Sequence, residues 1–421
     1  MTLLRGVGKL PGVLAGVALI AFPALLLPEP SAANATYTIL LLWSLGCAAT
    51  ALRPGACRWP QWWRGGWPLM LGMAGLPLAV VFHQALMGMA IDVPYLYLRF
   101  ALFGLLVWGL LNLGRSVLEV AQWGFAAGAI SSAIWIHFAT LGGRPAHVGI
   151  FNVIPFSNLA LLMGIVTVVS IGWSPGHRRV EIAVKFLAGL AGLYASYASG
   201  TRGGWIAIPV LLLVALLGFR RWSLRRRMAV FAALLVMGTV VGMASDTVRE
   251  RVAQSIRHLS DYGPDDLDTS EGGRLQVWAA SLRMIEAYPL TGVGVKGFEP
   301  ALEEQWRQGL VTTFAATLPH SHNDILYATA TLGIPGLLAI LALYLAPAWF
   351  FVRHLRSPDH PTAVAAVMGL AITTGFFMFG LTETMFVIAM TNAFYVLSLA
   401  VVVAFIVARR DELAAGGGAG A

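Results

Sequence analysis

The stretch HNDILYATATLGIPGLLAILALYLAPAWFF, residues 322–351, decides the fold class of this chain. It has no charged side chain between Ile325 and Phe351, and it is longer than the roughly 20 apolar residues that a helix needs to cross a bilayer. Because lipid offers the backbone no water to bond to, such a segment must be helical. The stretch predicts a transmembrane helix, in which Gly333 and Pro335 permit a kink or a close helix contact.

Composition extends this prediction to the whole chain. Of the 421 residues, 58% are hydrophobic and 11% are charged, and the mean hydropathy is +0.74. A soluble domain has about a quarter charged residues, so this balance is that of a protein dissolved in lipid. The net charge of +8 does not indicate nucleic-acid binding, because the basic residues form short clusters between apolar segments.

Apolar segments bounded by Gly, Pro and charge predict an all-α polytopic fold of about twelve transmembrane helices. The segments lie near residues 10–28, 35–52, 66–88, 95–113, 117–139, 156–173, 182–199, 204–219, 228–245, 323–351, 361–381 and 385–408. The expected domain order is helices one to nine in 1–245, a polar loop in 246–322, helices ten to twelve in 323–408, and a disordered tail in 409–421.

The positions of lysine and arginine predict that both termini are cytoplasmic. In that orientation every short inner connection carries basic residues, namely Arg5, Lys9, Arg53, Arg58, Arg64, Arg115, Arg178, Arg179, Lys185, five arginines in 220–227, Arg353, Arg356, Arg409 and Arg410. Outside the long loop, the outer side keeps only Arg144 and Arg202, and Arg99 falls inside the fourth helix. We therefore expect the loop 246–322 on the outer face.

The loop 246–322 contains one segment with helical periodicity. An acidic stretch runs to Asp268, and the sequence RLQVWAASLRMIEAYP follows from Arg274. Four of its apolar residues recur at helical spacing: Leu275, Trp278, Leu282 and Ile285. This spacing predicts an amphipathic helix on or near the membrane surface. The run PLTGVGVKGF after it predicts a Gly-rich turn.

Two outer arginines stand in unusual contexts. Arg202, in SGTRGGW, lies among glycines that leave the backbone amides approachable, which suits a phosphate oxyanion, although a guanidinium that extends to lipid headgroups fits equally well. Arg274 follows Gly272 and Gly273, and it is either a second phosphate ligand or a helix-start arginine paired with Glu271. A helix N-terminus disfavours a cation, which indicates some other stabilising partner.

Two histidines precede the decisive helix in PHSHNDILY. Neutral imidazole takes a proton from a hydroxyl, so His320 and His322 are candidates for a general base, the alternative being a surface or cap-adjacent role. Asn323 or Asp324 could cap the helix. A metal site would need further ligands, and the loop shows no tight Asp, Glu and His cluster, so we expect no metal.

Three motifs together resemble the O-antigen ligase and polymerase superfamily, and most closely its lipopolysaccharide O-antigen ligases. They are HN-x9-GIPG at 322–336, SGTRGGW around Arg202, and GGRLQVW with YPLTGVGVKGF after Arg274. The resemblance covers most of the chain through its helical framework and its long outer loop.

The resemblance implies a metal-independent C-type glycosyltransferase of the bacterial inner membrane, without cofactor and with a periplasmic active site. Its donor would be an O-antigen on undecaprenyl pyrophosphate and its acceptor a sugar hydroxyl of lipid A–core; membrane lipids would be further partners. Carried over, Arg202 and Arg274 bind the pyrophosphate and His322 activates the acceptor, with inversion at the anomeric carbon. Supporting residues would be His320, Asn323, Glu383 and Arg99.

Three other functions compete with this interpretation. An O-antigen polymerase tends to have two sizeable outer loops, and a protein O-oligosaccharyltransferase usually has an added soluble C-terminal region; this chain shows one such loop and ends soon after the twelfth segment. A secondary transporter would show repeats and broken helices at matching positions in its halves, and the outer loop has no counterpart in the first half.

Overall fold

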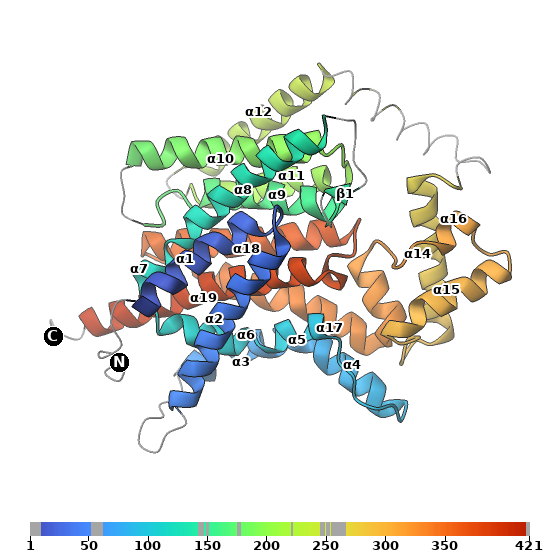
Figure 1. Ribbon diagram of the computed structural model, residues 1–421. Coiled ribbons are helices and arrows are strands. Elements are labelled where there is room, and N and C mark those ends of the chain that lie inside the picture. The colour runs from blue at the N-terminus through green and yellow to red at the C-terminus, as the bar shows by residue number, and fades with distance from the viewer. Residues whose placement is uncertain are drawn as a thin grey trace.

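The computed structural model describes residues 10–51, 62–141, 147–148, 151–174, 178–219, 222–244, 249, 253 and 267–417. This part of the chain is mostly helical, and its strands form a two-residue antiparallel ladder, in which β1 (His147–Val148) pairs with β2 (Phe151–Asn152). Six helices in it are long and apolar enough to cross a membrane, or seven if the bent pair α3–α4 is one span. The predicted all-α polytopic fold is therefore confirmed (Figure 1).

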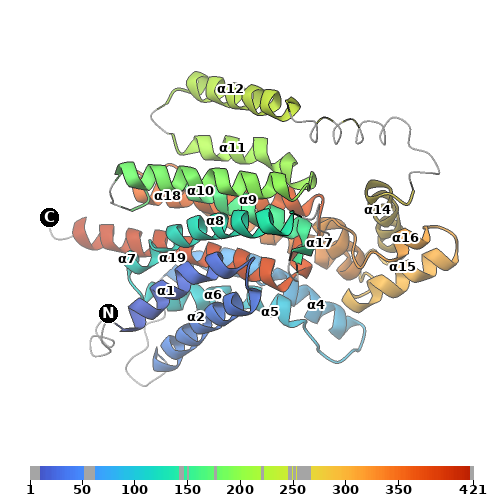
Figure 2. The ribbon, with the colours of Figure 1, turned by 45° about the horizontal axis from the view of Figure 1, so that its top comes forward.

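The first half of the chain supplies the helices that surround the centre of the bundle. They are α1 (Leu10–Leu25), α2 (Pro30–Ala51), α3 (Trp62–Met73), α4 (Gly75–Leu86), α5 (Tyr95–Ala101), α6 (Phe103–Leu111), α7 (Arg115–Leu118), α8 (Ala121–Ala139), α9 (Val153–Val169), α10 (Arg178–Ala198), the 3-10 helix η1 (Gly203–Ile206), α11 (Ala207–Leu217) and α12 (Leu224–Met243). Among them, α1 packs on α2 and α8, and α10 packs on α8 and α9. Helix α12 stands at the edge, next to α11 (Figure 2).

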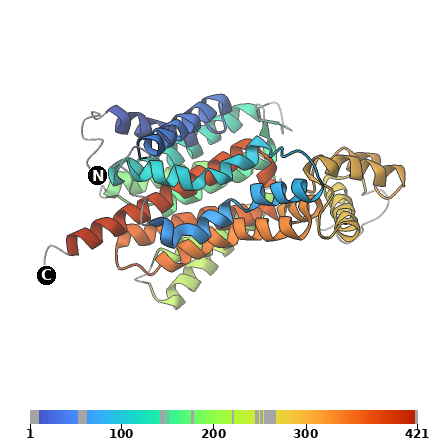
Figure 3. The ribbon, with the colours of Figure 1, turned by 90° about the horizontal axis from the view of Figure 1, so that it is seen from below.

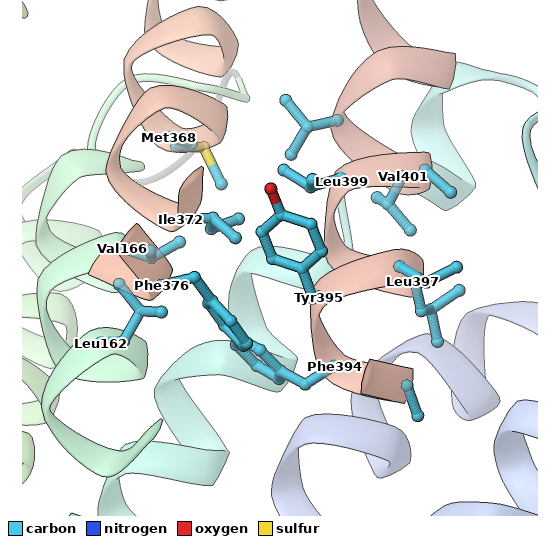
Figure 4. Packing of buried hydrophobic residues seen from close by; sticks show 14 of the residues in the cluster. Leu162, Val166, Met368, Ile372, Phe376, Phe394, Tyr395, Leu397, Leu399 and Val401 are labelled. Carbon is cyan, nitrogen blue, oxygen red and sulfur yellow. The ribbon is translucent and has the colours of Figure 1, made fainter. Parts of the chain in front are cut away.

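The second half supplies the centre and one end of the bundle. Its elements are α14 (Ser270–Ala287), η3 (Val295–Gly297), α15 (Phe298–Arg307), α16 (Thr313–Ala316), α17 (Asp324–His354), α18 (His360–Gly380), η4 (Met385–Val387) and α19 (Ala389–Gly417). Helices α18 and α19 are buried along most of their apolar length. Figure 4 shows the packing between α9, α18 and α19, in which the ring of Phe376 stacks on that of Phe394 and contacts that of Tyr395. Uniformly apolar helices of this kind belong at a core.

Each of the twelve predicted segments coincides with a helix or a helix pair, and the number that cross the bilayer stays a prediction. The basic residues Arg5, Lys9, Arg53, Arg58, Arg144, Arg220 and Arg221 lie outside the described residues, as does most of the acidic stretch 246–266. Elements α14 to α16 project from one end of the bundle, and the start of α1 and the end of α19 lie at the other (Figures 1 and 3). The loop 246–322 thus contributes a helical lobe at one end.

Helix α17 is not the straight span that its sequence predicts. Gly333 has φ 64° and ψ −153°, a conformation that only glycine adopts readily, and the chain folds back there. The hydroxyl of Tyr344 donates to Oδ2 of Asp324 at 2.8 Å. In a continuous helix residues 20 apart are about 30 Å apart, so residues 324–332 form a short limb that runs antiparallel to the long limb 334–354.

The predicted amphipathic helix forms as α14, and its predicted place on or near the membrane surface stays a prediction. Leu275 and Leu282 are exposed, whereas Val277, Ala280 and Met284 are buried in a small core under the lobe. The helix therefore packs on α17 and on the other lobe helices through these buried residues and not through Leu275 and Leu282.

The tail predicted to be disordered from residue 409 is also wrong as far as Gly417, because α19 continues to that residue. Arg409 pairs with Asp359 at 2.8 Å and with Glu412 at 3.3 Å, and Arg115 lies 3.4 Å from Glu412. These charged contacts extend the helix beyond its apolar part, which a reading of Gly and Ala content overlooks.

Candidate functional site

His322 and Glu383 meet at the end of α18, next to the lobe. Nδ1 of His322 lies 2.9 Å from Oε1 of Glu383, and the glutamate side chain is 2% exposed. With the glutamate ionised, Nδ1 carries the proton and donates it to the hydrogen bond, which leaves the lone pair on Nε2. This is the arrangement of a histidine that is oriented by a carboxylate to act as a base.

The backbone around His322 turns sharply to present the ring. His322 has φ 50°, in the left-handed region, and no other non-glycine residue among those described has a positive φ. Asn323 then caps the short limb of α17, since its side chain accepts from the amide of Leu326 at 3.0 Å. Non-glycine residues in this region cluster at functional sites, because surrounding contacts must offset the strain.

Glu383 is buried and ionised. Burial by itself raises its pKa, but the hydrogen bond with His322 and the nearby histidine charges outweigh it, so that the pKa lies below the usual glutamate value. Its Oε1 also accepts from the amide of Thr384 at 3.0 Å. Oε2 is buried and has no hydrogen-bond partner among the described residues, so the site contains an unsatisfied acceptor.

His320 lies beside the pair. Its ring centroid is 4.5 Å from that of His322, and its Nδ1 is 3.8 Å from Glu383. Burial lowers the pKa of His320 to about 4; Glu383 opposes that shift, and the charges of His322 and Arg274 add to it. His320 is therefore neutral near pH 7, and Arg274 is close enough for its field to act on this ring.

Arg202, which precedes η1, lies near the same region although it is far from His322 in the sequence. Its guanidinium lies 3.0 Å from Oε1 of Glu271, in the first turn of α14 and one turn before Arg274. A Cβ built on Gly203 would lie 3.1 Å from Oγ1 of Thr382, the neighbour of Glu383. Glu271, one of the predicted partners of Arg274, thus forms its ion pair with Arg202 instead. No described residue forms a hydrogen bond or ion pair with Arg274.

Arg99 serves another part of the structure. Its guanidinium donates to the carbonyl of Ala389 at the start of α19 and to Oδ1 of Asn34 at 3.1 Å, and it lies 5.1 Å from the ring centroid of Tyr37. Among the described residues its contacts join α5, α2 and α19, and none reaches His322. No contact of Arg99 among the described residues links it to His322, so its supporting role stays a prediction.

The GIPG and PLTGVG motifs pack against each other through backbone hydrogen bonds. Pro335 has no amide hydrogen, so the carbonyl of Thr331 loses its helical donor and accepts instead from Gly294 at 2.8 Å. The amide of Ile334 donates to Pro289 at 2.9 Å. A Cβ on Gly333 would lie 2.4 Å from the carbonyl carbon of Leu290. The Gly-rich segment after α14 therefore forms hydrogen bonds with the backbone groups that the fold-back of α17 leaves without helical partners. The nine residues between Asn323 and Gly333 set the length of the short limb, and so the position of His322 beside the long limb.

A glutamate from outside the loop 246–322 joins its two histidines. One ligand atom each from His320, His322 and Glu383 lies within 4.8 Å of the others. Glu383 is 61 residues from His322 in the sequence, so this group is not a cluster within the loop. The same three side chains serve equally as a hydrogen-bonded base and its neighbours, so the cluster does not by itself indicate a metal.

Comparisons with known proteins point to one family. A 188-residue part of the chain, 44% of it, is 22% identical to an uncharacterised protein of Haemophilus influenzae and covers 47% of that relative, so the match spans about half of its length. Residues 186–341 match the family model described as O-antigen ligase. This match contains Arg202, Arg274, His322 and the GIPG motif. The chain is thus a multi-pass membrane protein, and the part of it that contains the candidate site is similar to the O-antigen ligase family.

Proposed function

We propose that this protein is an O-antigen ligase, which transfers a polysaccharide from undecaprenyl pyrophosphate to a sugar hydroxyl of lipid A–core. The reaction takes place at the periplasmic face of the bacterial inner membrane, with both termini in the cytoplasm. The observation that carries the proposal is the 2.9 Å pair of His322 and Glu383, close to Arg274. A sugar hydroxyl is a poor nucleophile, and a positioned base contributes about 10²–10⁴-fold to its reaction.

Two arginines bind the pyrophosphate of the lipid-linked donor in this proposal. A polyprenyl pyrophosphate needs charge neutralisation to leave, and Arg202 and Arg274 supply it as preorganised guanidiniums without a metal ion. Glu271 holds Arg202 at α14, so both arginines are anchored to one helix start. Arg274 has no hydrogen-bond or ion-pair partner among the described residues, so its donors suit a phosphate.

In the proposed reaction, Nε2 of His322 takes the proton of the acceptor hydroxyl. The hydroxyl oxygen attacks the anomeric carbon of the donor sugar as the bond to the pyrophosphate oxygen breaks. One in-line displacement inverts that carbon, so no carboxylate needs to act as a nucleophile. The pyrophosphate leaves with the electron pair, and the two guanidiniums balance its charge.

Two relatives within the superfamily are the alternatives to a ligase. A polymerase would use a second lipid-linked glycan as the acceptor, and a protein O-oligosaccharyltransferase would use a Ser or Thr hydroxyl. A secondary transporter is the alternative of another class, and the buried His322–Glu383 pair with arginines nearby favours transfer over transport. Each alternative predicts a different acceptor or none.

In vitro transfer decides between them. Purified protein receives one lipid-linked glycan together with lipid A–core, a second lipid-linked glycan or an acceptor protein, each with and without excess chelator. The ligase proposal predicts product with lipid A–core alone and unchanged activity with chelator. Loss on chelation that one metal ion restores would assign His320, His322 and Glu383 to a metal site instead.

A further inference from the structure

Two residues directly after His322 hold the turn that carries Glu383. Nδ2 of Asn323 donates to the carbonyl of Leu381 at 3.1 Å, before Glu383 in the turn. Oδ1 of Asp324 accepts from the amide of Phe386 at 3.1 Å, after Glu383. Three consecutive residues thus contact one short turn: His322 contacts Glu383 itself, and Asn323 and Asp324 form hydrogen bonds on either side of it.

We propose that Asp324, together with Asn323, is a positioning residue that fixes the turn 381–386 on both sides of Glu383 and so holds its carboxylate on Nδ1 of His322. This inference deepens the proposed function and rests on it for the catalytic consequence. The contacts of Asn323 and Asp324 with the turn lie within the protein and involve no substrate.

The carboxylate of Asp324 is itself fixed from the second limb of α17. It is 2% exposed, and its Oδ2 accepts from the hydroxyl of Tyr344 at 2.8 Å. A Cβ on Gly380 would lie 2.6 Å from the same oxygen, so the last residue of α18 packs directly on this group. A buried carboxylate is costly unless it is hydrogen-bonded, and here each of its oxygens has one donor. Asp324 therefore joins the short limb, the long limb and the turn.

The backbone of the turn does not fix Glu383 without these contacts. The amides of Thr382 and Glu383 both donate to the carbonyl of Phe379, which attaches only the beginning of the turn to α18. Thr384 then has ψ 90°, and η4 follows as a single 3-10 turn. Asn392 of α19 donates a hydrogen bond to the carbonyl of Phe386 at 3.2 Å, and Asp324 of α17 accepts one from the amide of Phe386. A carboxylate displaced by 1 Å would lose the hydrogen bond on which the base depends.

The simpler explanation of Asp324 is a favourable charge at a helix start, with no effect on Glu383. Asp359 provides the matched control for that explanation. It accepts from the amide of Thr362 at 3.1 Å at the start of α18 and pairs with Arg409 at 2.8 Å. Both aspartates thus begin a helix and bind a second segment, but Asp359 lies at the opposite end of α18 from Glu383.

The first experiment measures kcat and KM for transfer by Asp324→Ala, Asp359→Ala and Glu383→Gln, alone and in combination. Asp324→Ala is expected to lower kcat about 10- to 100-fold with a smaller change in KM. In a Glu383→Gln background the same substitution should cost little more, because it acts through that glutamate. Asp359→Ala should lower the melting temperature and keep kcat. Losses from Asp324→Ala and Glu383→Gln that multiply would overturn the inference.

Asp324→Asn and Tyr344→Phe keep the test available if Asp324→Ala does not fold. Asp324→Asn retains Oδ1 for the amide of Phe386, and Tyr344→Phe removes only the second hydrogen bond. Both are expected to show a smaller fall in kcat of the same kind. A fall in melting temperature with kcat unchanged in both variants would show that Asp324 is structural only.

Hydrogen exchange of residues 381–388, measured without substrate, separates this inference from the proposed function. Faster exchange there in Asp324→Ala, and not in Asp359→Ala, supports the role of Asp324 in the turn even in a protein that transfers no glycan to lipid A–core. Unchanged exchange in Asp324→Ala overturns that role whatever reaction the protein performs.

Discussion

Nδ1 of His322 lies 2.9 Å from Oε1 of Glu383, although 61 residues of chain separate them. The fold-back of α17 brings the histidine to the end of α18, and the turn after α18 brings the glutamate to the histidine. The two residues are therefore placed by different helices of the central bundle. Their relationship leads to predictions about each group in the site.

Glu383→Gln should lower kcat about 10- to 100-fold, as part of the factor that a positioned base contributes. The amide can still accept from Nδ1, but it no longer balances the positive charge that forms on His322 when the ring takes a proton. Steady-state transfer kinetics measure this change. Glu303→Gln is the control, because Glu303 is exposed and pairs only with Arg307 within the described chain; equal losses in both variants would contradict a specific role for Glu383.

Replacement of Arg202 or Arg274 by alanine should lower kcat about 10²–10³-fold, the usual cost of one donor that stabilises a developing charge. Lysine should restore little activity at either position, because a single ammonium does not give two parallel bonds to a phosphate. Arg307→Ala serves as the control, since Arg307 is exposed and contacts Glu303 and Glu304. Full activity of Arg274→Lys would refute bidentate binding at that position.

Gly333→Ala should destabilise the protein by more than Gly309→Ala. Both glycines have positive φ, 64° and 73°, so each substitution costs about 1–3 kcal/mol of backbone strain. A Cβ on Gly333 would also lie 2.4 Å from the backbone of residue 290, whereas nothing lies within 4 Å of one on Gly309. Melting temperatures in detergent test this difference. Equal shifts would mean that the backbone contact yields without cost.

His320 should make the protein less stable as pH falls. Burial lowers its pKa from 6.5 to about 4, so between these values the unfolded chain binds a proton that the folded chain does not. The free energy of unfolding therefore drops as pH falls through this window, by about 2 kcal/mol at pH 5 relative to pH 7. Glu383, with a lowered pKa, loses its contribution only below its ordinary value of 4.5 and does not act in this range.

The comparison that isolates this effect is between the wild type and His320→Asn. Melting temperatures of the two proteins are measured at pH 7.5 and at pH 5. The wild type should lose more stability on acidification than the variant does. Parallel pH profiles would show that His320 is protonated freely in the folded protein.

The sequence predicted the helical framework well, because each span carries its own signal in apolar length and in charge at its ends. Through a resemblance to a family it also led to the hypothesis that Arg202, Arg274 and His322 share one site, which stays a prediction. The fold-back of α17 was not predictable from apolarity, since residues 325–332 carry no charged side chain and continue directly into the long limb. Glycine and proline in GIPG indicated a kink, but not its size.

The parts of the site that sequence reasoning missed depend on contacts between distant segments. The ion pair of Arg202 with Glu271 joins α14 to the turn before α11, and the Asp324–Tyr344 bond joins two limbs of one helical segment. Spacing along the chain carries no signal for such pairs.

The most direct measurement is transfer by His322→Ala, with the variant matched to the wild type for membrane insertion and melting temperature. Donor on undecaprenyl pyrophosphate and lipid A–core are supplied, and the attached glycan is quantified. The proposed mechanism predicts a loss of about 10²–10⁴-fold in kcat with donor binding retained. Wild-type transfer by this variant would contradict the assignment of His322 as the base and, with it, the proposed mechanism.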